Sequence, residues 1–435
     1  MNGFEASTVD SEYAAAARHL ADRLQSLAAP GRDGAPVWSG DDVDPVRSSG
    51  QRVVLTHGRL DDGLLTGRTG IAATLALCAR LPGGRPEWSD LASRAVRSAV
   101  RTVLDAAPAA GVLGWSSGWL GTARAADLIG RWTGDDQLVE AGRGLAGRAV
   151  RALAEEPRWY PDYPDLLDGW SGHLAAVLAA ELDHDLEPTR RTAATALLER
   201  LLPYADADPT SPDSPVSWPM AGTGPAVVGL AHGGSGITIA LAGARSAGLS
   251  SASSSDELIT RTRRWEDGHF RPAAGGWPDL RSADDVPGLA WCHGAPGVGI
   301  AAAYRALAGA PAGTELTFTR ASRMTLAYGT PTGSAPFDGT LCHGLTGLVE
   351  LHLLGAEAWP AARREHLANA RTLARHLTRA GRSGPGWVCG VRDGRTPNVL
   401  TGLAGVAYTL ARCHDPALAP SLAHPGLPAL VPAAT

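Results

Sequence analysis

Two Cys-His dipeptides, Cys292-His293 and Cys342-His343, stand 50 residues apart in this 435-residue chain. Each dipeptide runs into a Gly-x-x-Gly turn followed by an apolar segment. Thiolate and imidazole are the usual protein ligands of zinc. Because the spacing matches an internal repeat of the chain, the two pairs should meet at equivalent points of neighbouring units. The residues therefore predict a zinc site that handles sulfur chemistry.

The residue types leave the ligand set of this zinc site open. All four side chains can bind one ion and form a closed Cys2His2 structural site. Alternatively, three bind the ion and one coordination place stays open, as catalysis requires. Adjacent Cys and His residues reach the same ion only in some backbone geometries, so both arrangements stay open at this point.

Other titratable residues occupy the same repeat position, directly before the first glycine of the turn. Three successive repeats place His232, His293 and His343 there, and the repeat before them places Asp168. We expect these groups to converge at one end of the molecule. Each turn also precedes a helix start, whose positive dipole end favours thiolate over thiol.

The element that must position these groups is a sevenfold Gly-x-x-Gly repeat with starts 50 to 64 residues apart. After each turn comes an alanine-rich apolar segment, which predicts a buried helix. An amphipathic segment such as Ser89 to Leu104 follows, which predicts a helix that covers the core. Seven inner and seven outer helices describe an all-α fold, the α/α toroid. The first glycines are Gly67, Gly118, Gly169, Gly233, Gly294, Gly344 and Gly402.

The N-terminal segment can supply the outer helix that the last repeat lacks. The last inner helix, Gly405 to about Cys413, is followed by a Pro-rich tail that does not read as a helix. An unpaired amphipathic segment, about Ser11 to Leu27, precedes the first repeat and can supply the missing outer helix. We therefore predict one toroid domain over residues 1–415 and a tail over 416–435. Only 53–55 and 387–389 read as short strands.

Composition narrows the class of protein. The chain is 44% hydrophobic and 19% charged, which is typical of a soluble globular protein, and its net charge of −5 gives no reason to expect nucleic-acid binding. All 39 basic residues are arginine, which excludes Schiff-base lysine chemistry. The first residues lack a signal-peptide pattern, and no apolar run is long enough for a membrane span. Five scattered cysteines then predict reduced thiols and a cytoplasmic location.

Three features together resemble the lanthipeptide (lantibiotic) cyclase family, the lanthionine synthetase C-like proteins: Trp-Cys-x-Gly-x-Pro-Gly at 291–297, Cys-His-Gly at 342–344, and the seven repeats. The match runs from about Leu64 to Leu410 and resembles the stand-alone enzyme of that family. The resemblance implies a zinc-dependent cyclase that adds peptide cysteine thiols to dehydroalanine or dehydrobutyrine, a Michael-type reaction that forms (methyl)lanthionine thioether rings. It also implies a dehydrated precursor peptide, leader plus core, as substrate, with a dehydratase and a transporter as possible partners.

The resemblance also assigns roles to residues. It makes Cys292, Cys342 and His343 the zinc ligands, and it makes His232, in an Ala-His-Gly context, a general acid/base. The family aspartate falls on Asp165, which would orient or charge-balance His232. Asp168 is the second choice for that role, and its simpler interpretation is a helix N-cap.

Two positions depart from the family pattern. His293 stands where the family has tyrosine, and it becomes a candidate catalytic residue in that place. Gly288 stands where the family tends to have arginine, and Arg281 is the nearest arginine upstream.

Two other function classes stay open. A glycosidase on an α/α toroid needs paired carboxylates, which Asp165 and Asp168 can supply, but it leaves the Cys-His motifs unexplained. A non-catalytic relative would use the zinc structurally, as a scaffold or as a glutathione- or thiol-binding protein in a peptide-modification complex.

Overall fold

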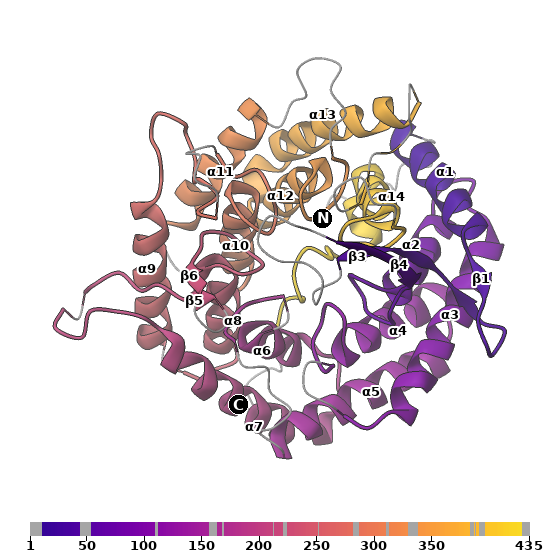
Figure 1. Ribbon diagram of the computed structural model, residues 1–435, viewed down its shortest axis with the longest axis horizontal. Coiled ribbons are helices and arrows are strands. Elements are labelled where there is room, and N and C mark those ends of the chain that lie inside the picture. Colours follow the sequence, from indigo (N-terminus) through magenta and orange to yellow (C-terminus); the bar gives the residue numbers. More distant parts are fainter. Residues whose placement is uncertain are drawn as a thin grey trace.

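The computed structural model describes residues 11–428 except 44–53, 109–111, 156–162, 168, 212, 221–223, 251, 282–286, 310–312, 329–337, 383–386, 388 and 391–395. The described residues form a double ring of helices around one axis (Figure 1). The predicted all-α toroid is therefore confirmed.

Within the described residues, the two rings hold seven helices each. The inner helices are α2 (Arg68–Ala79), α4 (Trp119–Thr133), α6 (Trp170–Ala179), α8 (Gly234–Ser246), α10 (Ala295–Leu307), α12 (Leu345–Ala358) and α14 (Leu403–His414). The outer helices are α1 (Glu12–Ser26), α3 (Pro86–Asp105), α5 (Asp136–Glu155), α7 (Glu187–Leu201), α9 (Ala252–Gly268), α11 (Thr314–Tyr328) and α13 (Arg363–Arg382).

The glycine motif explains how each inner helix begins. The first glycine is the N-cap, and because it has no capping side chain, the next N–H donates to a carbonyl seven residues earlier, as from Leu345 to Asp338 (3.0 Å). The second glycine lets another carbonyl approach the helix. A Cβ at Gly297 would lie only 2.3 Å from the carbonyl oxygen of Trp291. The same motif therefore builds the same tight loop in every repeat.

Helix α1 closes the outer ring, as the unpaired N-terminal segment predicts. It packs against α14 and also contacts α2 and α13. The hydroxyl of Ser11 accepts from the N–H of Ala14 as an N-cap and lies 2.9 Å from Nδ1 of His414. The hydroxyl of Tyr13 donates to the carbonyl of Arg371 on α13 (3.1 Å).

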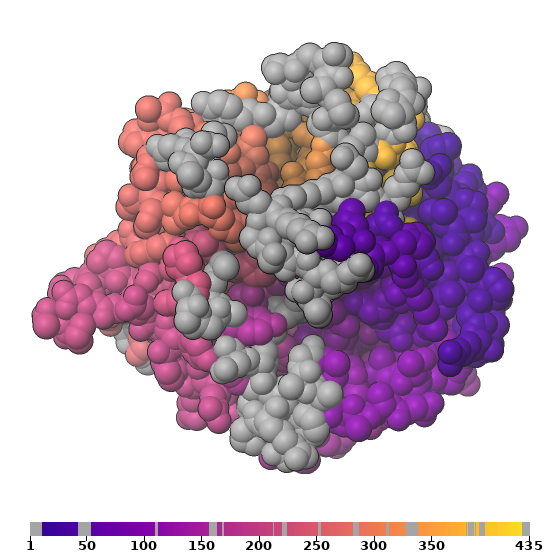
Figure 2. All heavy atoms as spheres, in the orientation of Figure 1, coloured from indigo at the N-terminus to yellow at the C-terminus, as the bar shows by residue number. Residues whose placement is uncertain are grey.

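The described part of the chain also contains three two-stranded antiparallel sheets. They pair β1 (Ala29–Pro30) with β2 (Pro36–Val37), β3 (Ser39–Val43) with β4 (Leu55–Arg59), and β5 (Pro219–Met220) with β6 (Gly224–Ala226). The atoms of β3 and β4 lie on the face that Figure 2 shows. Of the expected strands, Leu55 is the first residue of β4, whereas Val54, Trp387 and Cys389 are not in a strand; Val53 and Val388 lie outside the described residues. No helix in the described ranges is long and apolar enough to cross a membrane.

Backbone hydrogen bonds join neighbouring motif loops into a belt around one end of the ring. The carbonyl of Cys292 accepts from the N–H of Ala231 (3.2 Å), and that of Cys342 accepts from Trp291 (2.8 Å). The N–H of Cys342 in turn donates to Leu400 (2.9 Å). Further links run from Leu65 to Ser116, from Leu166 to Ala231 and from Leu400 to Leu65. This loop belt holds both cysteine loops in register with the loop that carries His232.

Candidate active site

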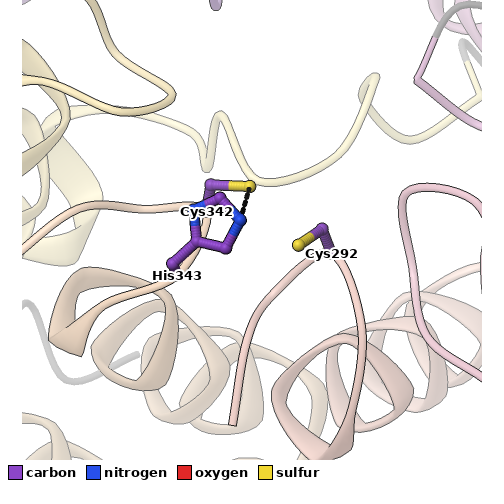
Figure 3. A group of neighbouring side chains, drawn as sticks. All are labelled: Cys292, Cys342 and His343. Atoms are coloured by element: carbon purple, nitrogen blue, oxygen red, sulfur yellow. Dashed lines mark hydrogen bonds between the residues drawn. The ribbon is translucent and has the colours of Figure 1, made fainter. Parts of the chain in front are cut away.

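Cys292, Cys342 and His343 come together at the starts of α10 and α12. One ligand atom from each lies within 4.8 Å of the others, and these three are the one such group among the described residues. Figure 3 shows the two thiols and the imidazole on adjacent loops, with Nε2 of His343 3.6 Å from Sγ of Cys342. Both cysteines are buried, whereas His343 is exposed. The group is therefore accessible from the imidazole side.

Proton sharing dominates the electrostatics of the three ligand atoms. Hydrogen bonds from Cys342 and His343 to the Cys292 sulfur hold the pKa of the Cys292 thiol well below its usual range. The same contact and burial raise the pKa of the Cys342 thiol. The hydrogen bond to the Cys292 thiolate also raises the pKa of His343. These interactions favour the thiolate form of Cys292, next to two groups that a cation could replace.

This donor set fits a thiophilic metal ion. Two sulfurs and one imidazole nitrogen in a compact cluster suit the tetrahedral preference of zinc, and three protein ligands leave a fourth place for another molecule. The cluster can therefore hold one metal ion with an open coordination place.

His232 and Asp165 form a hydrogen-bonded dyad beside the cluster. Nδ1 of His232 lies 2.6 Å from Oδ2 of Asp165, and both side chains are partly buried. The two residues come from successive repeats, on the loops before α8 and α6. A carboxylate on Nδ1 fixes the ring orientation and makes Nε2 the nitrogen that exchanges protons. Asp168, the second choice for this role, lies outside the described residues.

His293 is oriented toward His232 rather than toward the ligand cluster. Its ring stacks on the His232 ring with centroids 5.4 Å apart and an interplanar angle of 30°. Burial lowers the pKa of His293 to about 4, so the imidazole is neutral at pH 7. Within the described residues, the metal-ligand group does not include His293. The geometry thus favours the three-ligand arrangement over the four-ligand one.

The structure also explains the departure at Gly288. A Cβ at this residue would lie 3.0 Å from both Cα of Gly294 and the carbonyl oxygen of His293, so a larger side chain is crowded there. Arg281 instead forms a two-point ion pair with Asp279, at 2.9 and 2.7 Å. Its positive charge also acts on the Cys342 sulfur, where it favours thiolate.

One residue that the sequence does not single out supports the His232 loop from the outer ring. Glu266 of α9 is buried, and its carboxylate accepts from the N–H of Ser235 (2.8 Å), the hydroxyl of Ser235 (2.7 Å) and the N–H of Gly229 (3.5 Å). These two residues flank His232. Glu266 therefore fixes both ends of the loop that carries the imidazole.

Glu266 should make stability depend on pH. Burial raises its pKa to about 7, whereas the unfolded chain titrates near 4.5. The folded state therefore binds the Glu266 proton more tightly than the unfolded chain does. The stabilisation that this proton provides is complete below pH 4.5 and is lost as the pH rises through 7. We expect the free energy of unfolding to fall by about 3 kcal/mol on this account. Denaturant titrations from pH 4 to 8 should show a shallower fall for Glu266→Gln, and an unchanged slope would contradict the assignment.

Comparisons with known proteins agree with this geometry. A toroid of paired helices with two thiols and an imidazole at the loop belt defines an α/α-toroid protein with a candidate metal site. The family model for lanthionine synthetase C-like proteins matches residues 58–424, and the chain belongs to that family. Among solved structures, nisin cyclase superposes with a TM-score of 0.55 at 17% identity, covering 82% of this chain and 89% of that one, which supports the fold. No curated protein sequence matches the chain.

Proposed function

We propose that this protein is a zinc-dependent lanthipeptide cyclase, which adds peptide cysteine thiols to dehydroalanine or dehydrobutyrine and forms thioether rings. Membership of the lanthionine synthetase C-like family supports the reaction class. The observation that carries the proposal is the group of Cys292, Cys342 and His343, exposed on one side only and adjacent to a His–Asp dyad. Zinc bound to these three residues would hold a substrate thiol as a thiolate at neutral pH.

The protein's own groups suit the sulfur step. A free peptide thiol has a pKa of about 8.5 and is mostly protonated at neutral pH. Burial of Cys292 and Cys342 keeps their sulfurs from competing as nucleophiles in solvent, while the exposed His343 side leaves room for the peptide. Arg281 adds positive charge near the thiols and favours their anionic forms.

His232 suits the proton step. Addition of sulfur to the β-carbon of a dehydroamino acid creates an enolate, and a proton must reach the α-carbon to complete the thioether. Because Asp165 holds Nδ1, Nε2 of His232 is the atom that gives this proton, as a general acid. His293 stacks on the ring and, as a neutral neighbour, restricts its orientation without adding charge repulsion.

The substrate and setting follow from the same chemistry. Dehydroamino acids in peptides arise when serine or threonine loses water, so we infer a dehydrated precursor peptide, leader plus core, as the substrate. A dehydratase must then act first, and a transporter can follow in the same complex. The reduced thiols that the mechanism needs suit the cytoplasm. We infer that the helices of the catalytic toroid lie within residues 1–415, whereas part of the chain after them packs into its core.

Mass spectrometry with thiol alkylation tests the proposal. A peptide with one dehydroalanine and one cysteine is incubated with zinc-loaded protein and then treated with an alkylating reagent. We expect the product to keep its mass and to resist alkylation, because ring formation is an isomerisation that consumes the thiol. The same peptide with protein stripped of metal is the control. If zinc-loaded protein leaves the thiol open to alkylation, the protein is a scaffold or thiol binder rather than a cyclase.

A further inference from the structure

The chain after α14 returns into the ring of inner helices, where its yellow trace runs near the centre of the view (Figure 1). We name residues 418–428 the C-terminal plug. Its backbone is held by side chains of the inner helices: Arg412 donates to Ala419 (3.1 Å) and Tyr408 donates to Pro420 (2.9 Å). The Pro-rich sequence predicts a tail in this region, but most residues of the plug are buried.

Among the described residues, five of the seven inner helices hold the C-terminal plug by hydrogen bonds or a ring contact. Arg80 reaches it from the C-cap of α2, and Arg124 of α4 donates to the carbonyls of Ser421 and His424, both at 3.1 Å. The remaining contacts come from Tyr304 on α10, Glu350 on α12 and both Tyr408 and Arg412 on α14. The plug therefore packs as part of the protein core.

Trp291 connects the plug to the cysteine loops. Its buried indole N–H donates to the carbonyl of Ala423 in the plug (3.0 Å). Its backbone N–H donates to the carbonyl of Cys342 (2.8 Å), and the next residue in the chain is Cys292. The side chain of Trp291 therefore contacts the plug, while its backbone links the loop of Cys292 to the loop of Cys342.

The carbonyl that Trp291 binds is itself held in place. The N–H of Ala423 donates to the hydroxyl of Ser421 (3.0 Å), and that hydroxyl donates to Glu350 (2.8 Å). Glu350 is buried and forms an ion pair with Arg412. A chain of buried polar contacts thus runs from α12 and α14 through the plug to Trp291, and such networks hold a single geometry when each member is satisfied.

We propose that the C-terminal plug, through the indole of Trp291, is a positioning element of the metal centre that sets the separation of the Cys292 and Cys342 sulfurs. Trp291 does not touch the metal or the substrate in this proposal. It acts through the backbone that presents the two thiols. The inference rests on the proposed metal site, and metal binding is measured without any cyclase assay.

A matched pair of variants tests the proposal. Trp115 is the equivalent of Trp291 in the second repeat, three residues before the first glycine, and its buried indole also donates to a carbonyl, that of Leu166 (2.7 Å). Trp291→Phe and Trp115→Phe each remove one buried hydrogen bond, so we expect similar falls of about 2 °C in the Tm of metal-free protein. Zinc affinity, from competition with a chromogenic chelator, should fall about tenfold only in Trp291→Phe.

Two further measurements separate positioning from stability. The absorption of cobalt-substituted protein, which reports thiolate–metal geometry, should change in Trp291→Phe and stay unchanged in Trp115→Phe. Ser421→Ala, which loosens Ala423 without touching Trp291, should lower zinc affinity severalfold. Equal affinities and spectra for the two tryptophan variants would overturn the proposal, even if both variants lose stability. If wild-type protein binds no zinc, the proposed function itself fails, which is a different outcome.

Discussion

Cys342→Ala is expected to remove both metal binding and thioether formation. The variant leaves two donor atoms, Cys292 and His343, where three lie within 4.8 Å. Replacing residues that merely orient ligands lowers metal affinity by about 10- to 100-fold, so the loss of a ligand should exceed about 100-fold. Metal analysis after gel filtration should give about one zinc per chain for wild type and almost none for the variant. Alkylation of the peptide product should show no ring.

The control for this experiment is the same change at a cysteine away from the site. Cys78 is buried in α2, and its thiol donates to the carbonyl of Ala17 (3.7 Å). Cys78→Ala should lower stability slightly, as a small core residue does, and should keep full zinc content. Full ring formation by Cys342→Ala without zinc would refute a metal-dependent mechanism. Loss of zinc in both variants would point to unfolding and not to lost ligation.

The sequence predicts the toroid, and it predicts that the two thiols lie close together, because both features follow from the repeat. A motif that returns seven times places one loop per repeat at the same end, and Cys292 and Cys342 hold the same position in successive loops. The structure brings these thiols together through the loop belt, as the repeat requires. Periodicity could not decide the role of His293, because the direction of a side chain beside a ligand depends on local backbone angles. Gly294, for example, has a φ of +122°.

Residues that support the site from other elements could not be predicted. Glu266 lies on an outer helix that carries several charges, and nothing in that pattern shows that this one is buried beneath the His232 loop. Similarly, the prolines after α14 show that the helix ends, but they do not show where the chain goes next. Both contacts depend on tertiary packing between segments far apart in the chain, for which a single sequence carries no periodic signal.

His232→Ala should separate proton transfer from metal binding. The imidazole stands outside the ligand group, so we expect the variant to keep its zinc. A positioned general acid contributes about 10²- to 10⁴-fold to the rate, and the variant should lose that factor in ring formation. The initial rate of protection against alkylation measures the loss, and metal analysis of the same sample checks the zinc.

A matched histidine controls for the loss of a His–Asp pair. His57 on β4 is exposed, and its Nδ1 lies 2.7 Å from Oδ1 of Asp41, almost the geometry of His232 and Asp165. His57→Ala should keep the wild-type rate. Asp165→Asn should resemble His232→Ala more than wild type, because an amide in place of the carboxylate removes the charge that stabilises imidazolium and favours the other tautomer.

The stereochemistry of the product distinguishes a proton donor from a residue that only shapes the site. If His232 delivers the proton, the proton reaches the enolate from one side. Wild-type protein then yields a single configuration at the α-carbon that was part of the dehydroamino acid. Residual product from His232→Ala, protonated by water from either side, should contain both configurations, which chiral chromatography of the hydrolysed peptide resolves. If the slow variant still gave a single configuration, another group would be the proton donor. His293, which stacks on the His232 ring, would then be the next residue to replace.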